Sequence, residues 1–441
     1  MVTNYCNHSI EKLIRASSDH DYGCDNADKT YPHRIESAEA FVDFIGEPNH
    51  SVMTMRASAG HGVYGVKVFD FDRPKGQQAL SDWEASVDPD AVPYPVGSPT
   101  YFNKTVAVFV LDIRSNKSPW KKGLDAFRPD LEGDFLGDTQ WEWFEAAIAR
   151  SQAAVNIVVN GLQIHANMFP DGNMAESWGK YPTAQQRLFD ALLQDSVSAP
   201  ILISGDVHMA QFKRKDCKRD IGGSHFRPVV EMTTSGMTHS CGTIPSGPID
   251  NQDWKSTLYE RFESFVAGSM MTLLNIICPW TDVMLSNRPE TSRKPFEHSK
   301  LAKSKTGKQF SLQEKYGELE FDWDMRTVAM RALGEGGAPL LSAKWTMDQL
   351  SGRAVMPGSI VTSEDQSKAH AHTLVDGNWT CVNHRGRVNE IDYMLGHVAT
   401  GAALILLVPF PLILPAYVML VMTRKYLKTR APQIEKLQSH H

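Results

Sequence analysis

GDTQWEWFEAAIARSQAAVNIVVNGLQIHA, residues 137–166, places a helix directly before a strand. Apolar residues recur at helical spacing in its first half, and Asp138 or Thr139 can cap the helix. The run Val155–Val159 then has the length and the β-branched composition of a buried strand. The helix-to-strand order predicts an α/β protein.

The same order continues on both sides of this stretch. Residues 181–196 carry leucines at helical spacing and lead into a strand at Ile201. The Val- and Phe-rich segments 62–71 and 104–113 precede it as strands, and 229–239 adds a strand with a polar turn. Alternating strands and helices predict βαβ units and a sheet that is covered on both faces.

Composition is that of a globular protein. Of 441 residues, 42% are apolar and 22% charged, which is enough to bury a core in two or three domains or in one large α/β domain. The formal net charge of −6 gives no case for nucleic-acid binding. The six cysteines contain no CxxC pair, which argues against a zinc knuckle and leaves disulfides open but unpaired.

Two potential metal ligands follow the strand at Ile201. In PILISGDVHMAQF, residues 200–212, Asp206 and His208 stand one residue apart just after Ser204 and Gly205 end the apolar run. Sites in layered α/β folds form where loops leave the carboxyl ends of strands. We therefore expect chemistry at Asp206 and His208; the alternative is an ordinary turn with a surface histidine.

Charged and polar residues also end two earlier strands. Gln163 and His165 follow the strand at Val155–Val159, so they are expected beside Asp206 and His208. Arg114 follows the strand within 104–113 and could clamp a phosphate oxygen, although a structural ion pair is the commoner use.

An acidic loop occupies residues 17–37. Asp19, His20 and Asp21 stand close together there, in a stretch broken by Gly23 and Asn26. Carboxylates beside an imidazole suit a divalent cation such as Mn, Mg, Ca, Zn or Fe, and a solvated acidic loop is the alternative.

A transmembrane helix is expected near the C-terminus. Val398–Met422 holds no charge over 25 residues, which is enough to cross about 30 Å of hydrocarbon at 1.5 Å per residue. Arg424, Lys425, Lys428 and Arg430 follow it and predict a cytosolic C-terminus. The large domain would then be lumenal or extracellular, and residues 1–18 lack the apolar segment of a signal peptide.

The side of the membrane predicted for the large domain carries five glycosylation sequons, at Asn7, Asn49, Asn103, Asn116 and Asn378. We expect a single-pass membrane glycoprotein.

Several motifs together resemble the PhoD-like alkaline phosphatase family of the metallophosphoesterase superfamily. They are SDHDYG at 18–23, LDIR at 111–114, LGDTQWEWFEAAIARSQAAVNIVVNGLQ, ESWGKYP at 176–182, SGDVH at 204–208, TTSGMTH at 233–239 and YGELEFDWD at 316–324. The resemblance runs from about Asp19 to Arg331, in the family's order and spacing.

The resemblance implies a four-layer α/β sandwich of two mixed sheets flanked by helices. It also implies a centre of two divalent metal ions that hydrolyses phosphomonoesters or phosphodiesters through a metal-activated water. By position in the motifs, Asp19 and His208 resemble metal ligands, and Asp206 resembles a ligand or a group that orients His208. His20 resembles the group that stabilises charge or protonates the leaving alkoxide. The remaining candidates would contact the substrate or orient the ligands: Asp21, Asn26, Arg114 and Gln163.

The sequence departs from the family pattern at its start. The pattern has an earlier strand and a loop that supplies further metal ligands, and Ser17 and Ser18 stand where it has Trp and Asp. We expect an N-terminally truncated chain, with a natural short isoform as the alternative.

The predicted domains are a metallophosphoesterase domain at 1–335, an accessory region at 336–397, the membrane helix at 398–422 and a basic tail at 423–441. The predicted function is metal-dependent hydrolysis of phosphate esters. The alternative is a catalytically deficient membrane protein that binds a partner or a phosphorylated ligand.

Overall fold

The computed structural model describes residues 22, 26–74, 104–122, 125, 130–165, 176–220, 224–237, 310–311, 313–354, 379–383, 417, 419 and 421. Contacts divide the chain into two compact units, Met1–Arg387 and Val388–His441. The helices and strands discussed below all belong to the first unit.

A mixed sheet forms the centre of this unit, in the order β1-β2-β3-β4-β6-β5-β11, with β7 also paired to β5. Strands β2, β3, β4 and β6 are parallel, and β1, β5, β7 and β11 join antiparallel. The bounds are β1 Gly65–Asp70, β2 Thr105–Val110, β3 Val155–Val159, β4 Pro200–Ser204, β5 Ala210–Asp220, β6 Ser224–Thr234, β7 Phe310–Ser311 and β11 Thr380–Asn383.

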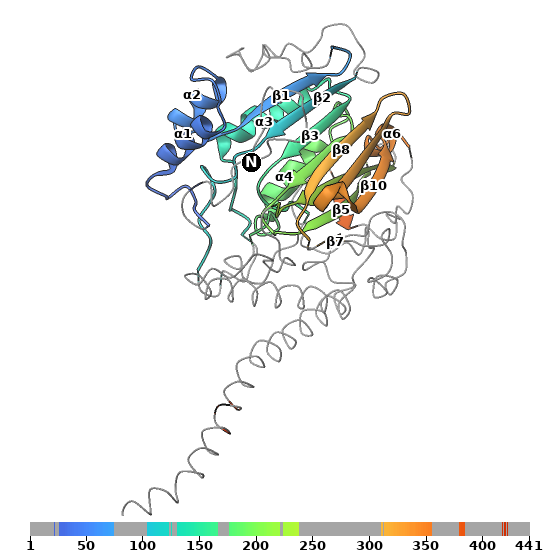
Figure 1. Ribbon diagram of the computed structural model, residues 1–441. Coiled ribbons are helices and arrows are strands. Elements are labelled where there is room, and N and C mark those ends of the chain that lie inside the picture. Colours follow the sequence, from blue (N-terminus) through green and yellow to red (C-terminus); the bar gives the residue numbers. More distant parts are fainter. Residues whose placement is uncertain are drawn as a thin grey trace, which may run out of the picture. The chain divides into compact units, whose positions relative to one another are not determined.

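Two helices cover one face of this sheet (Figure 1). They are α3 Asp138–Ala149 and α4 Pro182–Leu192. Phe144 and Leu188 from these helices pack with Phe109, Val158 and Leu202 of the strands, and all five side chains are fully buried. The predicted helix-strand repeats are confirmed here, because β2, β3 and β4 pair parallel with a helix between successive strands.

A second, antiparallel sheet covers the opposite face, in the order β10-β9-β8 (Figure 1). Its strands are β8 Tyr316–Asp322, β9 Thr327–Leu333 and β10 Pro339–Thr346, followed by α6 Met347–Leu350. Met330 of β9 and Trp345 of β10 pack against Ile201 and Met232 of the main sheet. Successive side chains of a central strand point to opposite faces, so they pack alternately in the core under the helices and in the core under the second sheet.

These layers confirm the α/β class and refine its details. The second sheet is antiparallel in its described strands, which corrects the expectation of a second mixed sheet. The boundary expected at residue 335 falls in the 3₁₀ turn Glu335–Gly337, between strands that pair with each other. The second sheet therefore continues past that position.

Two smaller features complete the first unit. Helices α1 Arg34–Phe44 and α2 Val52–Ser58 pack together through Phe41 and Met53. The predicted side-chain cap of α3 is wrong: the N-cap residue is Gly137 at φ +72°, and no side chain caps the helix. Asp134 instead accepts the Gly137 N–H at 2.7 Å.

A disulfide joins β5 to β11. Cys217 and Cys381 face each other in the antiparallel register, and their Cα atoms lie 3.9 Å apart. Both residues are buried, at 0% and 6% exposure. The sequence left this pairing open because 164 residues separate the two cysteines.

Among the residues that the structure describes, no helix is long and apolar enough to cross a membrane. Of the predicted span, only Tyr417, Met419 and Val421 are described, and all three are helical with exposed side chains.

Candidate metal centre

The turns after β3 and β4 lie against each other at the carboxyl edge of the main sheet. The Asn160 N–H donates to Ile203 O at 3.0 Å, which extends the parallel pairing into the turns. A Cβ on Gly205 would stand 3.4 Å from Gly161 O, so the two backbones are nearly in contact. The turns after β3 and β4 therefore adjoin, and the expectation that Gln163 and His165 lie beside Asp206 and His208 stays a prediction.

Asp206 and His208 occupy a strained turn. Their φ angles are +72° and +49°, in the left-handed region that residues other than glycine rarely adopt. The turn is tight, since the Val207 N–H donates to Gly205 O at 3.0 Å. Such backbone strain costs about 1–3 kcal/mol per residue and clusters at functional sites. The strain supports the choice of these two residues as ligands.

The turn is held from the second sheet's side by Lys315, which precedes β8. The side-chain ammonium of Lys315 donates to His208 O at 3.1 Å, and the backbone N–H of Lys315 donates to Gly236 O at 3.3 Å. Lys315 is 3% exposed. The sequence did not reveal this residue, because it lies 107 positions from His208 and in no recognisable motif.

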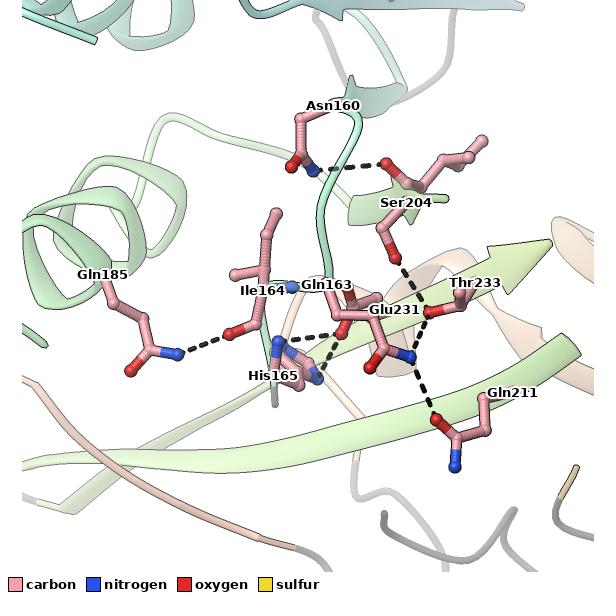
Figure 2. Close-up of polar contacts among 10 residues, drawn as sticks. Asn160, Gln163, Ile164, His165, Gln185, Ser204, Gln211, Glu231 and Thr233 are labelled. Atoms are coloured by element: carbon pink, nitrogen blue, oxygen red, sulfur yellow. Dashed lines mark hydrogen bonds and ion pairs between the residues drawn. The ribbon is translucent and has the colours of Figure 1, made fainter. Parts of the chain in front are cut away.

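Gln163 belongs to a buried polar network that links three strands, as Figure 2 shows. Its amide nitrogen donates to Gln211 Oε1 at 2.9 Å and to Thr233 Oγ1 at 3.1 Å. The Thr233 hydroxyl also bonds the Ser204 hydroxyl at 2.8 Å. This network fixes Gln163 above the end of β4 and couples it to the strand that carries Asp206.

Glu231 on β6 binds the backbone that follows Gln163. Its two carboxylate oxygens accept the N–H groups of Ile164 and His165 at 2.7 and 2.8 Å (Figure 2). The Gln185 side chain from α4 donates to Ile164 O. Because Glu231 is fully buried, these bonds hold the turn after β3 without competition from water.

His165 is buried and neutral. Its imidazole packs on Phe189 with ring centroids 5.6 Å apart, and neither ring nitrogen has a hydrogen-bond partner among the described residues. Burial, reinforced by the positive charges of Lys215 and Lys213, lowers the pKa of His165 well below 6.5. Its Nδ1 lies 3.9 Å from Glu231 Oε2, but an ion pair there would need the protonated ring that this environment opposes.

Arg114 is fully buried and forms an ion pair with Glu176 at 2.5 Å. Glu176 Oε1 also forms an ion pair with Lys117 Nζ at 3.2 Å and accepts a hydrogen bond from the Trp120 indole N–H at 2.5 Å. Burial, partly offset by the charge of Glu176, lowers the pKa of Lys117. Two cations therefore share one described carboxylate at the carboxyl end of β2. The Arg114 side chain thus forms a structural ion pair with Glu176, whereas its backbone N–H donates to Asp112.

Asp112 instead ties two loops together. Its carboxylate accepts the N–H of Val63 at 2.6 Å, the Ser115 hydroxyl at 2.6 Å and the N–H of Arg114 at 2.8 Å. A Cβ on Gly62, at φ +108°, would stand 2.5 Å from Asp112 Oδ2, so this close approach requires glycine.

The N-terminal segment reaches the same end of β2. The Tyr22 hydroxyl donates to Ser115 Oγ at 2.9 Å, and Asn26 O accepts from Lys117 Nζ at 3.3 Å. Asn26 adopts φ +57°. Asp19, His20 and Asp21 lie outside the described residues, and Tyr22 follows them directly in the sequence.

The donor types fit a divalent metal. Asp206 and His208 offer the carboxylate and imidazole ligands that Fe, Zn and Mn accept, and both are only partly exposed. Within the described ranges, no group of three or more His, Cys, Asp or Glu could hold a metal ion. Asp19, the third predicted ligand, lies outside those ranges.

Fold and site together define a layered α/β protein whose candidate ligands project from the carboxyl ends of parallel strands. Residues 100–264 match the family model described as PhoD-like phosphatase. This match confirms the resemblance over that segment, which is less than half of the chain. It includes Arg114, Gln163, Asp206 and His208.

A solved structure described as "Structure of PhoD" is also similar, at 13% identity and a TM-score of 0.31. The alignment covers 67% of this chain and 48% of that one, so the chain spans about half the length of its solved neighbour. The comparison with curated proteins found no match.

Proposed function

We propose that this chain is a metal-dependent phosphohydrolase that cleaves phosphate monoesters or diesters. One observation carries the proposal: within the segment that matches PhoD-like phosphatases, Asp206 and His208 occupy two left-handed positions at the end of a central parallel strand. Strained backbone positions cluster at functional sites, which supports the proposal.

The proposed centre is dinuclear. Asp19, Asp206 and His208 would hold divalent metals drawn from Fe, Zn, Mn, Mg and Ca. When bound, such a centre supplies Lewis acidity and a water that is deprotonated near neutral pH.

Side chains of the protein would carry out proton transfer, contact the substrate and orient the ligands. His20 protonates the leaving alkoxide. Asp21, Asn26, Arg114 and Gln163 contact the substrate or orient the ligands.

The buried network makes this arrangement rigid. Glu231 and Gln185 fix the peptide after Gln163, and Thr233 links Gln163 to Ser204 at the base of the ligand turn. Catalysis by metal-bound groups depends on such preorganisation, because a small displacement of a reacting group costs much of the rate.

We further propose that the chain is anchored in a membrane by Val398–Met422, with the catalytic domain lumenal or extracellular and the C-terminus cytosolic. The Cys217–Cys381 disulfide supports this, because disulfides persist in oxidising compartments. Of the two sequons that the structure describes, Asn49 stands in an exposed turn and is the better placed for a glycan.

The test uses the full chain purified in detergent and supplied with Mn²⁺, with p-nitrophenyl phosphate and bis(p-nitrophenyl) phosphate as substrates. We expect hydrolysis by the parent and a loss of at least about 10-fold in Asp206→Asn and in His208→Ala. Asp195→Asn is the matched control, because Asp195 is exposed and pairs with Arg219 on the surface.

Elemental analysis separates the two readings of the chain. Two metals per folded parent chain, reduced in the Asp206→Asn and His208→Ala proteins, would support the enzyme. His20→Ala should retain metal and lose about 100-fold or more in rate. A folded parent that binds no metal and hydrolyses neither substrate would favour a catalytically deficient binding protein instead.

A further inference from the structure

We propose that Lys315 is a positioning residue of the candidate metal centre. It fixes the strained turn that presents His208, and it does so from a segment outside the matched residues 100–264. Its effect on metal binding rests on the proposed function, whereas its effect on the turn does not.

The position of Lys315 is set on two sides. Its N–H donates to Gly236 O at 3.3 Å, in the segment after β6. Two residues further on, a Cβ on Gly317 would stand 2.7 Å from Thr234 Oγ1, so the start of β8 approaches the end of β6 as closely as only glycine permits. The second sheet thus brings a buried ammonium to a fixed place at the edge of the main sheet.

The ammonium is directed at one backbone atom of a predicted ligand. Lys315 Nζ donates to His208 O at 3.1 Å, and His208 holds φ +49°. A charge-assisted hydrogen bond in a buried setting is roughly twice as strong as a neutral one. It can therefore offset part of the strain of a left-handed histidine and limit the orientations of the imidazole.

Two other contacts lie on either side of this turn. The Ser235 N–H reaches Met209 O at 3.4 Å, one residue beyond His208. The Ser204–Thr233 hydroxyl pair lies before the turn, at the end of β4. Among these contacts, the Lys315 ammonium is the one that acts on His208 itself.

The experiment compares the full-length parent, Lys315→Met, Lys315→Arg and the control Lys344→Met. Lys344 is an exposed residue of β10 that faces away from both cores. Hydrogen exchange of the metal-free proteins, read at the peptide covering residues 204–209, measures the turn directly. Calorimetric titration with Mn²⁺ measures the affinity for the metal, and kcat and KM for p-nitrophenyl phosphate measure the effect on hydrolysis.

We expect Lys315→Met to exchange faster at residues 206–209 and to bind Mn²⁺ about 10- to 100-fold more weakly, as for other residues that orient metal ligands. The loss should fall on kcat rather than KM. Lys315→Arg, which keeps a cationic donor, should recover part of the affinity, and Lys344→Met should match the parent. A merely structural lysine would lower the melting temperature without changing Mn²⁺ affinity.

Unchanged exchange and unchanged Mn²⁺ affinity in folded Lys315→Met would overturn the proposal. If that variant does not fold, Lys315→Gln is measured by the same readouts and judged by the same criteria. If the parent itself binds no Mn²⁺, the proposed function fails, and the exchange rate alone decides the role of Lys315: faster exchange supports it and equal exchange refutes it.

Discussion

Glu231 on β6 and Ile164 after β3 are joined by a hydrogen bond of 2.7 Å, although β4 lies between their strands in the sheet. The bond fastens the turn after β3 across the end of β4, the strand that leads to Asp206 and His208. Glu231 is fully buried, and its second oxygen accepts the His165 N–H at 2.8 Å. The carboxylate is therefore matched to two adjacent backbone donors.

Glu231→Gln should weaken the fold by about 1–3 kcal/mol, because the new amide NH₂ would face a buried backbone N–H and leave both unsatisfied. Urea denaturation measures the change in free energy of unfolding. Glu318→Gln on exposed β8 is the control, since its ion pair with Arg331 is partly exposed and contributes at most about 1 kcal/mol. Equal effects of the two substitutions would show that Glu231 has no special role.

His165 should make the fold sensitive to acid. Its pKa is well below 6.5 in the folded chain and near 6.5 in the unfolded chain, so below pH 6.5 the unfolded state binds the extra proton. This contribution to stability is present above pH 6.5 and is lost as the pH falls, by about 1.4 kcal/mol per pH unit until the folded ring also protonates.

The variant His165→Phe keeps an aromatic contact with Phe189 and removes the titrating group. We expect its free energy of unfolding to fall less steeply than that of the parent between pH 7 and pH 5. The difference between the two slopes should be about 1.4 kcal/mol per pH unit below pH 6.5. Parallel curves for the two proteins would mean that His165 binds protons equally in the folded and unfolded chains, which would contradict a lowered pKa.

Loss of the Cys217–Cys381 bond should cost about 2–5 kcal/mol, the usual range for a native disulfide. The double variant Cys217→Ala and Cys381→Ala should melt at a lower temperature than the oxidised parent. Peptide mapping under non-reducing conditions identifies the linked pair. A parent with both thiols free and the same melting temperature would contradict this pairing.

Two sequons should differ in use if the domain passes through a secretory compartment. Asn49 is exposed, whereas the Asn116 amide nitrogen donates to His61 O at 2.9 Å. A Cβ on Gly137 would lie 2.9 Å from Asn116 Cβ, which shows how tightly that residue is packed. Mass spectrometry of glycosidase-treated peptides from folded protein should find a glycan at Asn49 and none at Asn116. The reverse pattern would refute the packing argument.

The sequence predicted the parts of the fold that rest on local patterns. The apolar run at β3 and the helix at α3 were visible because buried parallel strands and amphipathic helices leave simple periodicities. Strand β5, AQFKRKDCKRD, was not predicted, because charged residues dominate it. Lys213 and Arg214 are nonetheless 3% and 2% exposed, so tertiary burial outweighs their composition.

The candidate site was predictable only where a motif carries it. Asp206 and Gln163 follow strands, and the structure places their turns together. Glu231 and Lys315 were missed because each acts on the backbone of a residue distant in sequence, and such a contact imposes no local pattern. The roles assigned to Asp19, His20 and Asp21 stay predictions.

The outer edge of β5 is shared by two short strands. β7 pairs with its first two residues, Ala210 and Gln211, and β11 pairs with Lys215 to Lys218. An uncovered strand edge is a template on which other chains can add, which is how native sheets come to aggregate. Because the disulfide holds β11 in place, reducing it would expose the unpaired backbone of a long strand, and self-association through that edge would follow.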